Sequence, residues 1–159
     1  MSKFTDLIKD VTGIFDAMSQ SEDLAKCVID NNNNYLDGAT PDFTSLKYDQ
    51  IIPYRMLAEE ATLNKTYISF FFNEFDSEKD SAIKNGFLEF HIYTHKDNII
   101  TDYGLRQYMI AHYIDELFNG WSFSGIGKME FESYDDIEPD EVNPYVHQIL
   151  KYKISYLNN

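Results

Sequence analysis

The sequence predicts an α+β domain, an antiparallel or mixed sheet of about four strands with helices packed on one face, preceded by N-terminal helices and a long arm. Two observations carry this prediction. Four segments in the second half of the chain alternate apolar and polar residues, which is typical of strands. One longer segment between them repeats apolar residues every three or four positions, which is typical of a helix. Paired strands around one helix favour an α+β fold over a doubly wound one.

Residues 1–30 are predicted to form two helices. The stripe of apolar residues at helical spacing predicts a first amphipathic helix that ends near Ser19. Residues 19–22, with the sequence SQSE, have the spacing of a capping box and predict the start of a second, shorter helix. Four asparagines, residues 31–34, end the helical pattern. The stripe of the first helix consists of Phe4, Leu7, Ile8, Val11, Ile14, Phe15 and Met18.

Residues 31–64 show little periodicity, and Gly38, Pro41 and Pro53 interrupt them. Connections of this length without structure of their own tend to be functional or disordered. Two interpretations stay open. The segment is either an arm or long loop that reaches a partner, or an irregular lid packed on the protein's own core.

Residues 65–159 are predicted to form the α+β core. Residues 66–75 and 87–95 alternate with period two, and the polar break between them predicts an antiparallel hairpin. Residues 101–118 predict a helix with Thr101 or Asp102 as its N-cap and Asn119 and Gly120 as its stop. Residues 128–134 and 145–156 predict two further strands. With 159 residues, the chain suits one domain overall.

The charge of the chain argues against several classes of partner. Twenty-seven acidic residues face 13 basic ones, giving a net charge of −14. A nucleic-acid binder that neutralises phosphates needs clustered Lys and Arg, and an anionic membrane surface attracts the same residues. The N-terminal segment has no secretory core, and no apolar stretch suits a membrane span. We therefore expect no membrane partner, and action in the cytosol or in a particle assembled there.

Tests for catalytic and metal-binding motifs fail. Residues 120–128 are glycine-rich, but they lack the spacing of a phosphate-binding loop. His91 and His95 share a face of one predicted strand, yet four residues along a strand separate them by about 13 Å, too far for one zinc ion. Cys27 is expected to pack as a small apolar side chain in its helix. The sequence thus predicts no catalytic residue, metal or cofactor.

Seven carboxylates and no basic residue occupy residues 130–141. With Pro139 among them, they predict a solvated acidic loop that can repel DNA or dock on a basic partner. The candidates for this acidic surface, or for the wall of a channel, are Asp135, Asp136, Glu138, Asp140 and Glu141.

Aromatic residues on both faces of the first predicted strand suggest an interface. One face can form the core, and the other must be covered by the N-terminal helices or by a neighbouring subunit. Tyr67 and Phe71 are the interface candidates on the non-core face. Asp76, Glu78 and Lys79 are the candidates in the hairpin loop.

Residues 67–156 resemble the tail terminator and tail-completion proteins of long-tailed bacteriophages, which also include head-tail connector or neck components. The resemblance rests on the hairpin TYISFFFNEF and FLEFHIYTHKD, the helix GLRQYMIAHYIDELFNGWSF, the turn SGIGKMEF and the closing strand YVHQILKYKI. The N-terminal helices and the arm depart from the shortest members of that family.

The resemblance implies a structural protein of the virion, not an enzyme, that acts in the tail or neck after assembly in the host cytoplasm. It implies a homo-hexameric ring between the tail tube protein and the head-side connector, through which DNA passes without specific binding. Six acidic copies would line a channel that repels phosphates. The alternative is a monomeric acidic binding protein, an inhibitor or DNA mimic that acts on a basic host protein. A small hydrolase is the third hypothesis.

Overall fold

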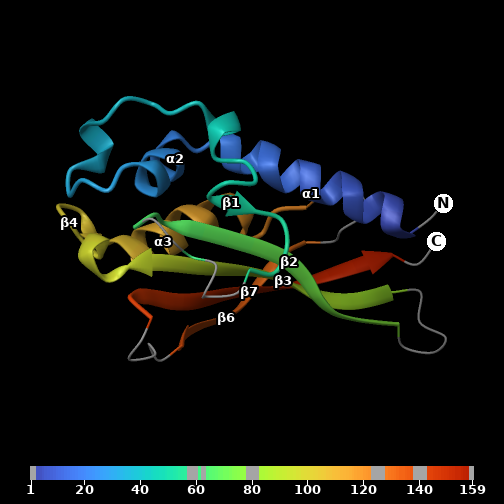
Figure 1. Cartoon of the computed structure of the whole chain (residues 1–159). Helices are drawn as coiled ribbons and strands as arrows, with labels where there is room; N and C mark the ends of the chain where they lie inside the picture. The colour runs from blue at the N-terminus through green and yellow to red at the C-terminus, as the bar shows by residue number, and fades with distance from the viewer. Residues whose placement is uncertain are drawn as a thin grey trace.

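The computed structural model describes residues 3–56, 61, 64–77, 83–122, 128–137 and 143–157. Its elements form two layers, with the helices together on one face of a long sheet (Figure 1). The helices are α1 (Lys3–Ser19), α2 (Glu22–Ile29) and α3 (Arg106–Phe118). The α+β prediction is confirmed.

The main sheet has five strands in the order β1-β2-β3-β7-β6. β1 runs parallel to β2, and the other neighbours are antiparallel. The sheet is therefore mixed, with β1 and β6 at its edges. Its strands are β1 (Ile51–Ile52), β2 (Tyr67–Ser77), β3 (Ile83–His95), β6 (Glu130–Ile137) and β7 (Tyr145–Leu157).

The core lies between the helices and the sheet. Phe70 of β2 and Phe90 of β3 have ring centroids 5.9 Å apart, and Phe118 of α3 stacks on Phe90 at 5.1 Å. The side chains of Ile14 in α1 and Leu24 in α2 are fully buried in the same cluster. The alternation seen in the sequence is thus the alternation between this core and the open face of the sheet.

Residues 31–56 pack on the protein's own core, as the lid interpretation has it. They contain the short 3-10 helices Tyr35–Asp37 and Phe43–Ser45, followed by β1. Tyr35, Leu46 and Ile51 are fully buried. The hydroxyl groups of Tyr35 and Tyr113 of α3 lie 2.8 Å apart, in hydrogen-bonding contact.

The second helix begins at a serine other than the one that starts the capping-box pattern. Ser21, not Ser19, is the N-cap of α2, and its hydroxyl accepts a hydrogen bond from the Leu24 amide at 3.2 Å. α1 continues to Ser19. Overlapping serines offer two caps, and the local backbone selects one of them.

The third helix begins later than predicted. Residues 100–105 form a small hairpin of β4 (Ile100–Thr101) and β5 (Gly104–Leu105), so the predicted N-cap at Thr101 or Asp102 is wrong. The Thr101 hydroxyl donates to the Gly104 carbonyl at 2.6 Å, and Gly104 has a φ of 141°. The threonine that could cap a helix closes a turn instead.

Candidate functional site

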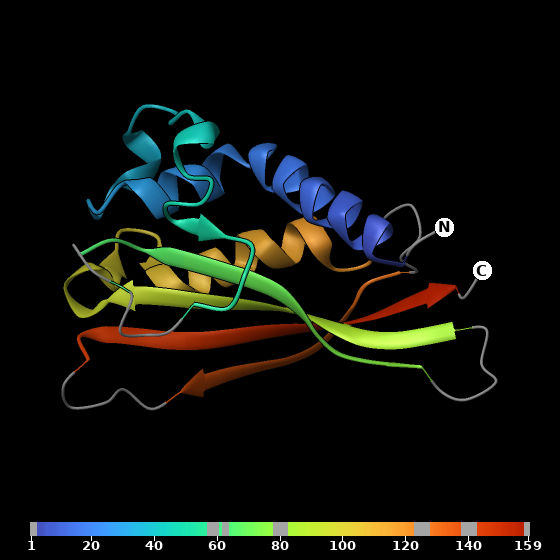
Figure 2. The same ribbon diagram turned by 45° about the vertical axis from the view of Figure 1, so that its right-hand side comes forward.

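The face of the sheet that the helices leave open is crossed by residues 53–56. The Ser69 hydroxyl on β2 donates to the Tyr54 carbonyl, and the Tyr93 hydroxyl on β3 donates to the Met56 carbonyl at 2.9 Å. The segment leaves β1 at one edge, passes around β2 and lies against the open face (Figure 2). We call residues 53–56 the strap.

The strap covers a second, smaller apolar cluster that includes Tyr67. Tyr67 is 6% exposed, so the chain itself buries this ring, for which we expected a cover from the N-terminal helices or from a neighbouring subunit. Alternation in a strand shows that a second face needs a cover, but it does not show what the cover is. The cluster consists of Ile52, Met56, Ala61, Tyr67, Tyr93 and Tyr145.

Phe71, the second predicted interface residue, is half-buried at the border of the strap. The guanidinium carbon of Arg55 lies 4.7 Å from the centre of its ring, which is a cation–π contact. Arg55 is an exposed residue. The interface role of Phe71 stays a prediction. Any partner that reaches its ring would also meet the Arg55 side chain.

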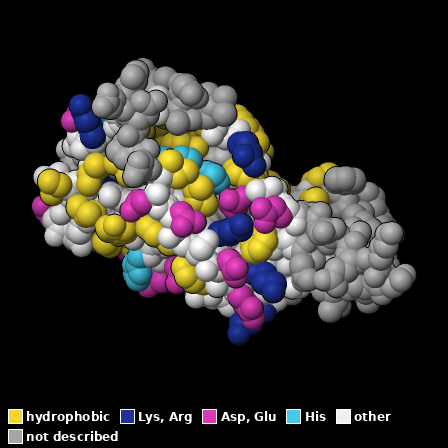
Figure 3. All heavy atoms as spheres, turned by 90° about the horizontal axis from the view of Figure 1, so that it is seen from below, with side chains coloured by type: hydrophobic (Ala, Val, Ile, Leu, Met, Phe, Trp, Pro, Cys, Tyr) yellow, Lys and Arg dark blue, Asp and Glu magenta, His cyan; other side chains and the backbone are white. Residues whose placement is uncertain are grey.

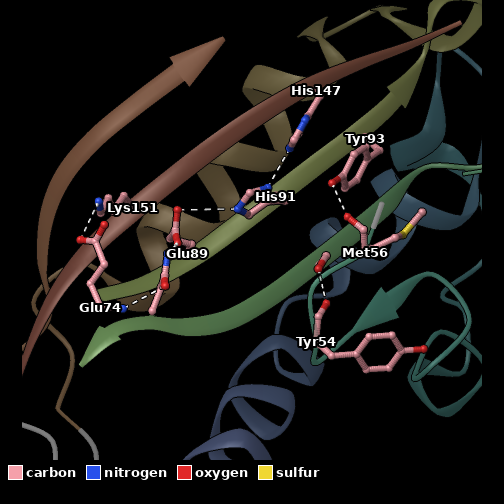
Figure 4. A network of polar contacts seen from close by, with 10 residues as sticks. Tyr54, Met56, Glu74, Glu89, His91, Tyr93, His147 and Lys151 are labelled. Atoms are coloured by element: carbon pink, nitrogen blue, oxygen red, sulfur yellow. Dashed lines mark hydrogen bonds and ion pairs between the residues drawn. The ribbon is translucent and has the colours of Figure 1, made fainter. Parts of the chain in front are cut away.

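Two histidines that are far apart in the sequence meet beside the strap (Figure 4). His91 Nδ1 of β3 lies 2.7 Å from His147 Nε2 of β7, so one ring donates a hydrogen bond to the other. The ring of Tyr93 stacks on that of His147 with centroids 4.3 Å apart, and the ring centroids of Phe71 and His91 are 4.8 Å apart. Burial lowers the pKa of both histidines to about 4, and Arg55 further lowers that of His91. Both rings are neutral at pH 7.

Polar side chains continue from the histidines along β2, β3 and β7 (Figure 4). Glu89 Oε1 lies 3.7 Å from His91 Nε2, and Asn73 Nδ2 donates to Glu89 Oε2 at 2.7 Å. Lys151 Nζ lies 3.5 Å from Glu74 Oε2. These contacts tie three strands together across the open face, where acidic and basic side chains lie beside an apolar area (Figure 3).

The His91–His147 pair makes the contacts between β3 and β7 sensitive to pH. A neutral imidazole can accept a proton, and its burial makes the charged form costly. The thiol of Cys27 lies elsewhere, on α2, and burial raises its pKa to about 11, so it is protonated at neutral pH. In the part of the chain that is described, no three His, Cys, Asp or Glu side chains are grouped to hold a metal ion.

The predicted acidic loop begins as a strand. Asp135 and Asp136 belong to β6, opposite Ile149 and Gln148 of β7, so the prediction of a loop is wrong for these two residues. Both carboxylates are exposed, and that of Asp136 accepts a hydrogen bond from the Gln148 amide. Pairing with β7 extends β6 beyond the apolar alternation that marks its start. Glu138, Asp140 and Glu141 lie outside the described residues.

The hairpin candidates are placed only in part. The backbone of Asp76 belongs to β2, which continues to Ser77, so its predicted place in the hairpin loop is wrong. It pairs with Asn85 of β3 after an irregularity between Asn73 and Asp76. Glu78 and Lys79 lie outside the described residues. Their predicted role in an interface stays a prediction.

A groove of about 420 Å³ runs between α3 and β6 on the helix side of the sheet. Phe131 of β6 and Tyr108 of α3 are each 48% exposed there. β6 is the last strand of the sheet, so one side of its backbone faces away from β7. The sequence analysis did not predict this surface. Its one signal was the apolar Phe131 between two acidic residues, because an apolar side chain in an exposed acidic segment can mark a contact surface. The lining residues are Tyr108, Ala111, His112, Asp115, Asn119, Phe131, Tyr134 and Leu150.

The fold and these surfaces define a small α+β protein with an open sheet edge beside an apolar groove. Residues 21–154 match the sequence model of the family described as YomW, and the chain belongs to this family. The family is phage-associated. Among curated proteins, none gives a significant match. None of the helices in the described ranges is long and apolar enough to cross a membrane.

Proposed function

We propose that the protein is a structural component of a phage particle, a tail terminator or neck ring that joins the tail tube to the head-side connector and lets DNA pass. The observation that carries this proposal is the open β6 edge, in a chain of a phage-associated family. Phe131 is exposed there beside the groove at α3, and Ile137, opposite His147, is exposed on the other face of the sheet. The proposed site of action is the tail or neck of the virion.

An open edge strand with exposed apolar side chains is a liability for a protein that stays alone. Its backbone donors and acceptors can pair with another chain, and its apolar side chains favour burial. β6 is eight residues long, which is long enough for such pairing. A permanent partner along this edge would pair these backbone groups and bury these side chains.

The acidity of the chain supports the same role. Each copy carries a net charge of −14, so a ring of copies presents a strongly negative surface to DNA. Repulsion between carboxylates and phosphates lets DNA slide past without being held. Under this proposal the work of the protein lies in its interfaces and not in a catalytic site.

Native mass spectrometry and negative-stain imaging of the full chain test the proposal. We expect a closed ring of fixed stoichiometry, hexameric by the resemblance, either alone or with phage tails that lack their head-proximal protein. Phe131→Asp should disrupt it because it places a charge in the apolar contact. Ile100→Asp is the matched control, since Ile100 is 71% exposed on β4 and not on β6.

A monomeric acidic inhibitor or DNA mimic is the second candidate, favoured by the exposed carboxylates along β6. Such a protein would bind one basic host protein tightly and would not bind itself. A species of 18.6 kDa that joins neither its own copies nor phage tails would overturn the ring proposal.

A further inference from the structure

The two edges of the main sheet carry opposite charge. On β6, four acidic residues flank two exposed apolar ones, and we call this set the acidic edge. In the described part of the chain, none of the four carboxylates takes part in an ion pair. The acidic edge consists of Glu130, Phe131, Glu132, Asp135, Asp136 and Ile137.

The opposite edge, beside β1, carries two cations and two exposed tyrosines. Lys47 Nζ lies 5.1 Å from the ring centre of Phe15, and Arg55 lies over Phe71. Among the described residues, neither cation has a carboxylate within ion-pair distance. Tyr48 is 65% exposed and Tyr54 is 54% exposed. We call Lys47, Tyr48, Tyr54 and Arg55 the basic edge.

The exposed Tyr48 of this edge stands in a strained turn. Its φ of 63° is in the left-handed region, which is costly for an aromatic residue. The Tyr48 amide donates to the Ile51 carbonyl at 2.8 Å, and this bond closes the turn before β1. The turn thereby presents a tyrosine, a residue type enriched where proteins bind one another.

We propose that the acidic edge of one copy docks against the basic edge of the next copy, head to tail, an inference that rests on the proposed ring function. Phe131 and Ile137 then pack against Tyr48 and Tyr54, and the carboxylates of the acidic edge meet Lys47 and Arg55. A contact between two different patches is heterologous, and heterologous contacts repeat until a ring closes.

A symmetric contact between two acidic edges is disfavoured. It would place carboxylates opposite carboxylates, and like charges on facing strands repel. The head-to-tail contact exchanges this repulsion for attraction and pairs two cations that lack carboxylate partners in the described structure. Charge complementarity thus favours the basic edge of a second copy as the partner of the acidic edge.

Crosslinking through introduced cysteines distinguishes the two geometries. In one chain, Glu132→Cys with Tyr48→Cys places a thiol on each edge, and Cys27, fully buried, is left in place. The edges are about 19 Å apart, four strand spacings of about 4.8 Å, so a shorter bismaleimide cannot join them within one copy. The head-to-tail contact predicts a ladder of covalent oligomers. Each single variant alone should stay uncrosslinked.

Charge reversal is the second arm of the experiment. Lys47→Glu with Arg55→Glu, or Glu132→Lys with Asp135→Lys, should each weaken self-association about tenfold or more. All four changes in one chain should restore most of it, because the charges are again complementary. Asp102→Lys, exposed in the turn between β4 and β5, is the matched control and should have little effect.

Three results would overturn the inference. Crosslinked dimers of Glu132→Cys alone would show a symmetric contact. A ring without a crosslinked ladder would reject the edge contact and leave the ring function standing, whereas a monomer under all conditions would reject both. Acidic-edge reversals that abolish binding to a basic foreign protein, but leave self-association unchanged, would assign the edge to that partner instead.

Discussion

Arg106 shows how one side chain can hold several segments together. It is fully buried, and its guanidinium donates to the carbonyls of Asn98, Cys27, Asp30 and Asn32 at 2.8, 2.6, 2.8 and 2.9 Å. Two of these carbonyls lie at the C-terminal end of α2, where a cation also favours the helix dipole. One of the two arginines of the chain is thus structural.

Replacing Arg106 should be strongly destabilising. Arg106→Met removes the donors from four carbonyls at once, and we expect the free energy of unfolding to fall by about 3–5 kcal/mol. Chemical denaturation followed by circular dichroism measures this change. Arg106→Lys keeps the charge but not the planar fork, so its free energy of unfolding should lie between those of the wild type and of Arg106→Met. A loss below about 1 kcal/mol for Arg106→Met would contradict the role.

The histidine pair predicts a pH dependence of stability. The pKa of both His91 and His147 is about 4 in the folded chain, below the usual 6.5. Between pH 4 and 6.5 the unfolded chain binds more protons than the folded chain. The free energy of unfolding should therefore be highest above pH 6.5 and should fall as the pH drops toward 4. Thermal unfolding at a series of pH values measures this loss.

The matched variants isolate the pair from other acid effects. His91→Gln with His147→Gln should lose less stability than the wild type over the same pH range. His112→Gln removes a histidine whose side chain is 56% exposed, so it should follow the wild type. Equal pH dependence in all three proteins would show that the pair does not control it.

At the scale of elements, the hairpin of β4 and β5 depends on Gly104. Its φ of 141° lies in a region that other residues rarely adopt, although a Cβ there would meet only the flexible side chain of Met109, with Sδ at 3.5 Å. Gly104→Ala should therefore cost about 1–3 kcal/mol through backbone strain and not through a clash. Urea denaturation of this variant beside Asp102→Ala, in the same turn, tests this. Equal stability of the two variants would argue against the strain.

Long periodic elements were predictable and short ones were not. The stripe of α1 and the alternation of β2, β3 and β7 each extend over many residues, so the pattern is unambiguous. β1 and the hairpin of β4 and β5 consist of two-residue strands, which carry no period. α3 begins later than predicted because a threonine such as Thr101 can either cap a helix or close a turn.

For the whole molecule, the acidic surface gives a prediction about assembly. Reversing Asp135, Asp136 and Glu138 to lysine should leave the fold intact, because Asp135 and Asp136 are exposed, with a small loss from the bond between Asp136 and Gln148. Ring assembly or DNA passage should be impaired, since the edge or channel changes sign. Circular dichroism checks the fold, and particle imaging with infection assays checks the rest. Unchanged assembly and infection would make these residues merely solvated.

The sequence alone determined the α+β class, the acidic character and the face of each long strand, because these depend on composition and on a local period. The tertiary structure decided which remote segments meet. It brings His147 into hydrogen-bonding contact with His91 and the carbonyl of Cys27 to the guanidinium of Arg106, and it packs the strap against Tyr67. Such contacts depend on strand register and on the path of the segment after β1, and neither leaves a periodic signal in the chain. For the same reason, only the tertiary structure placed the acidic residues of β6 and the cations beside β1 at opposite edges of one sheet.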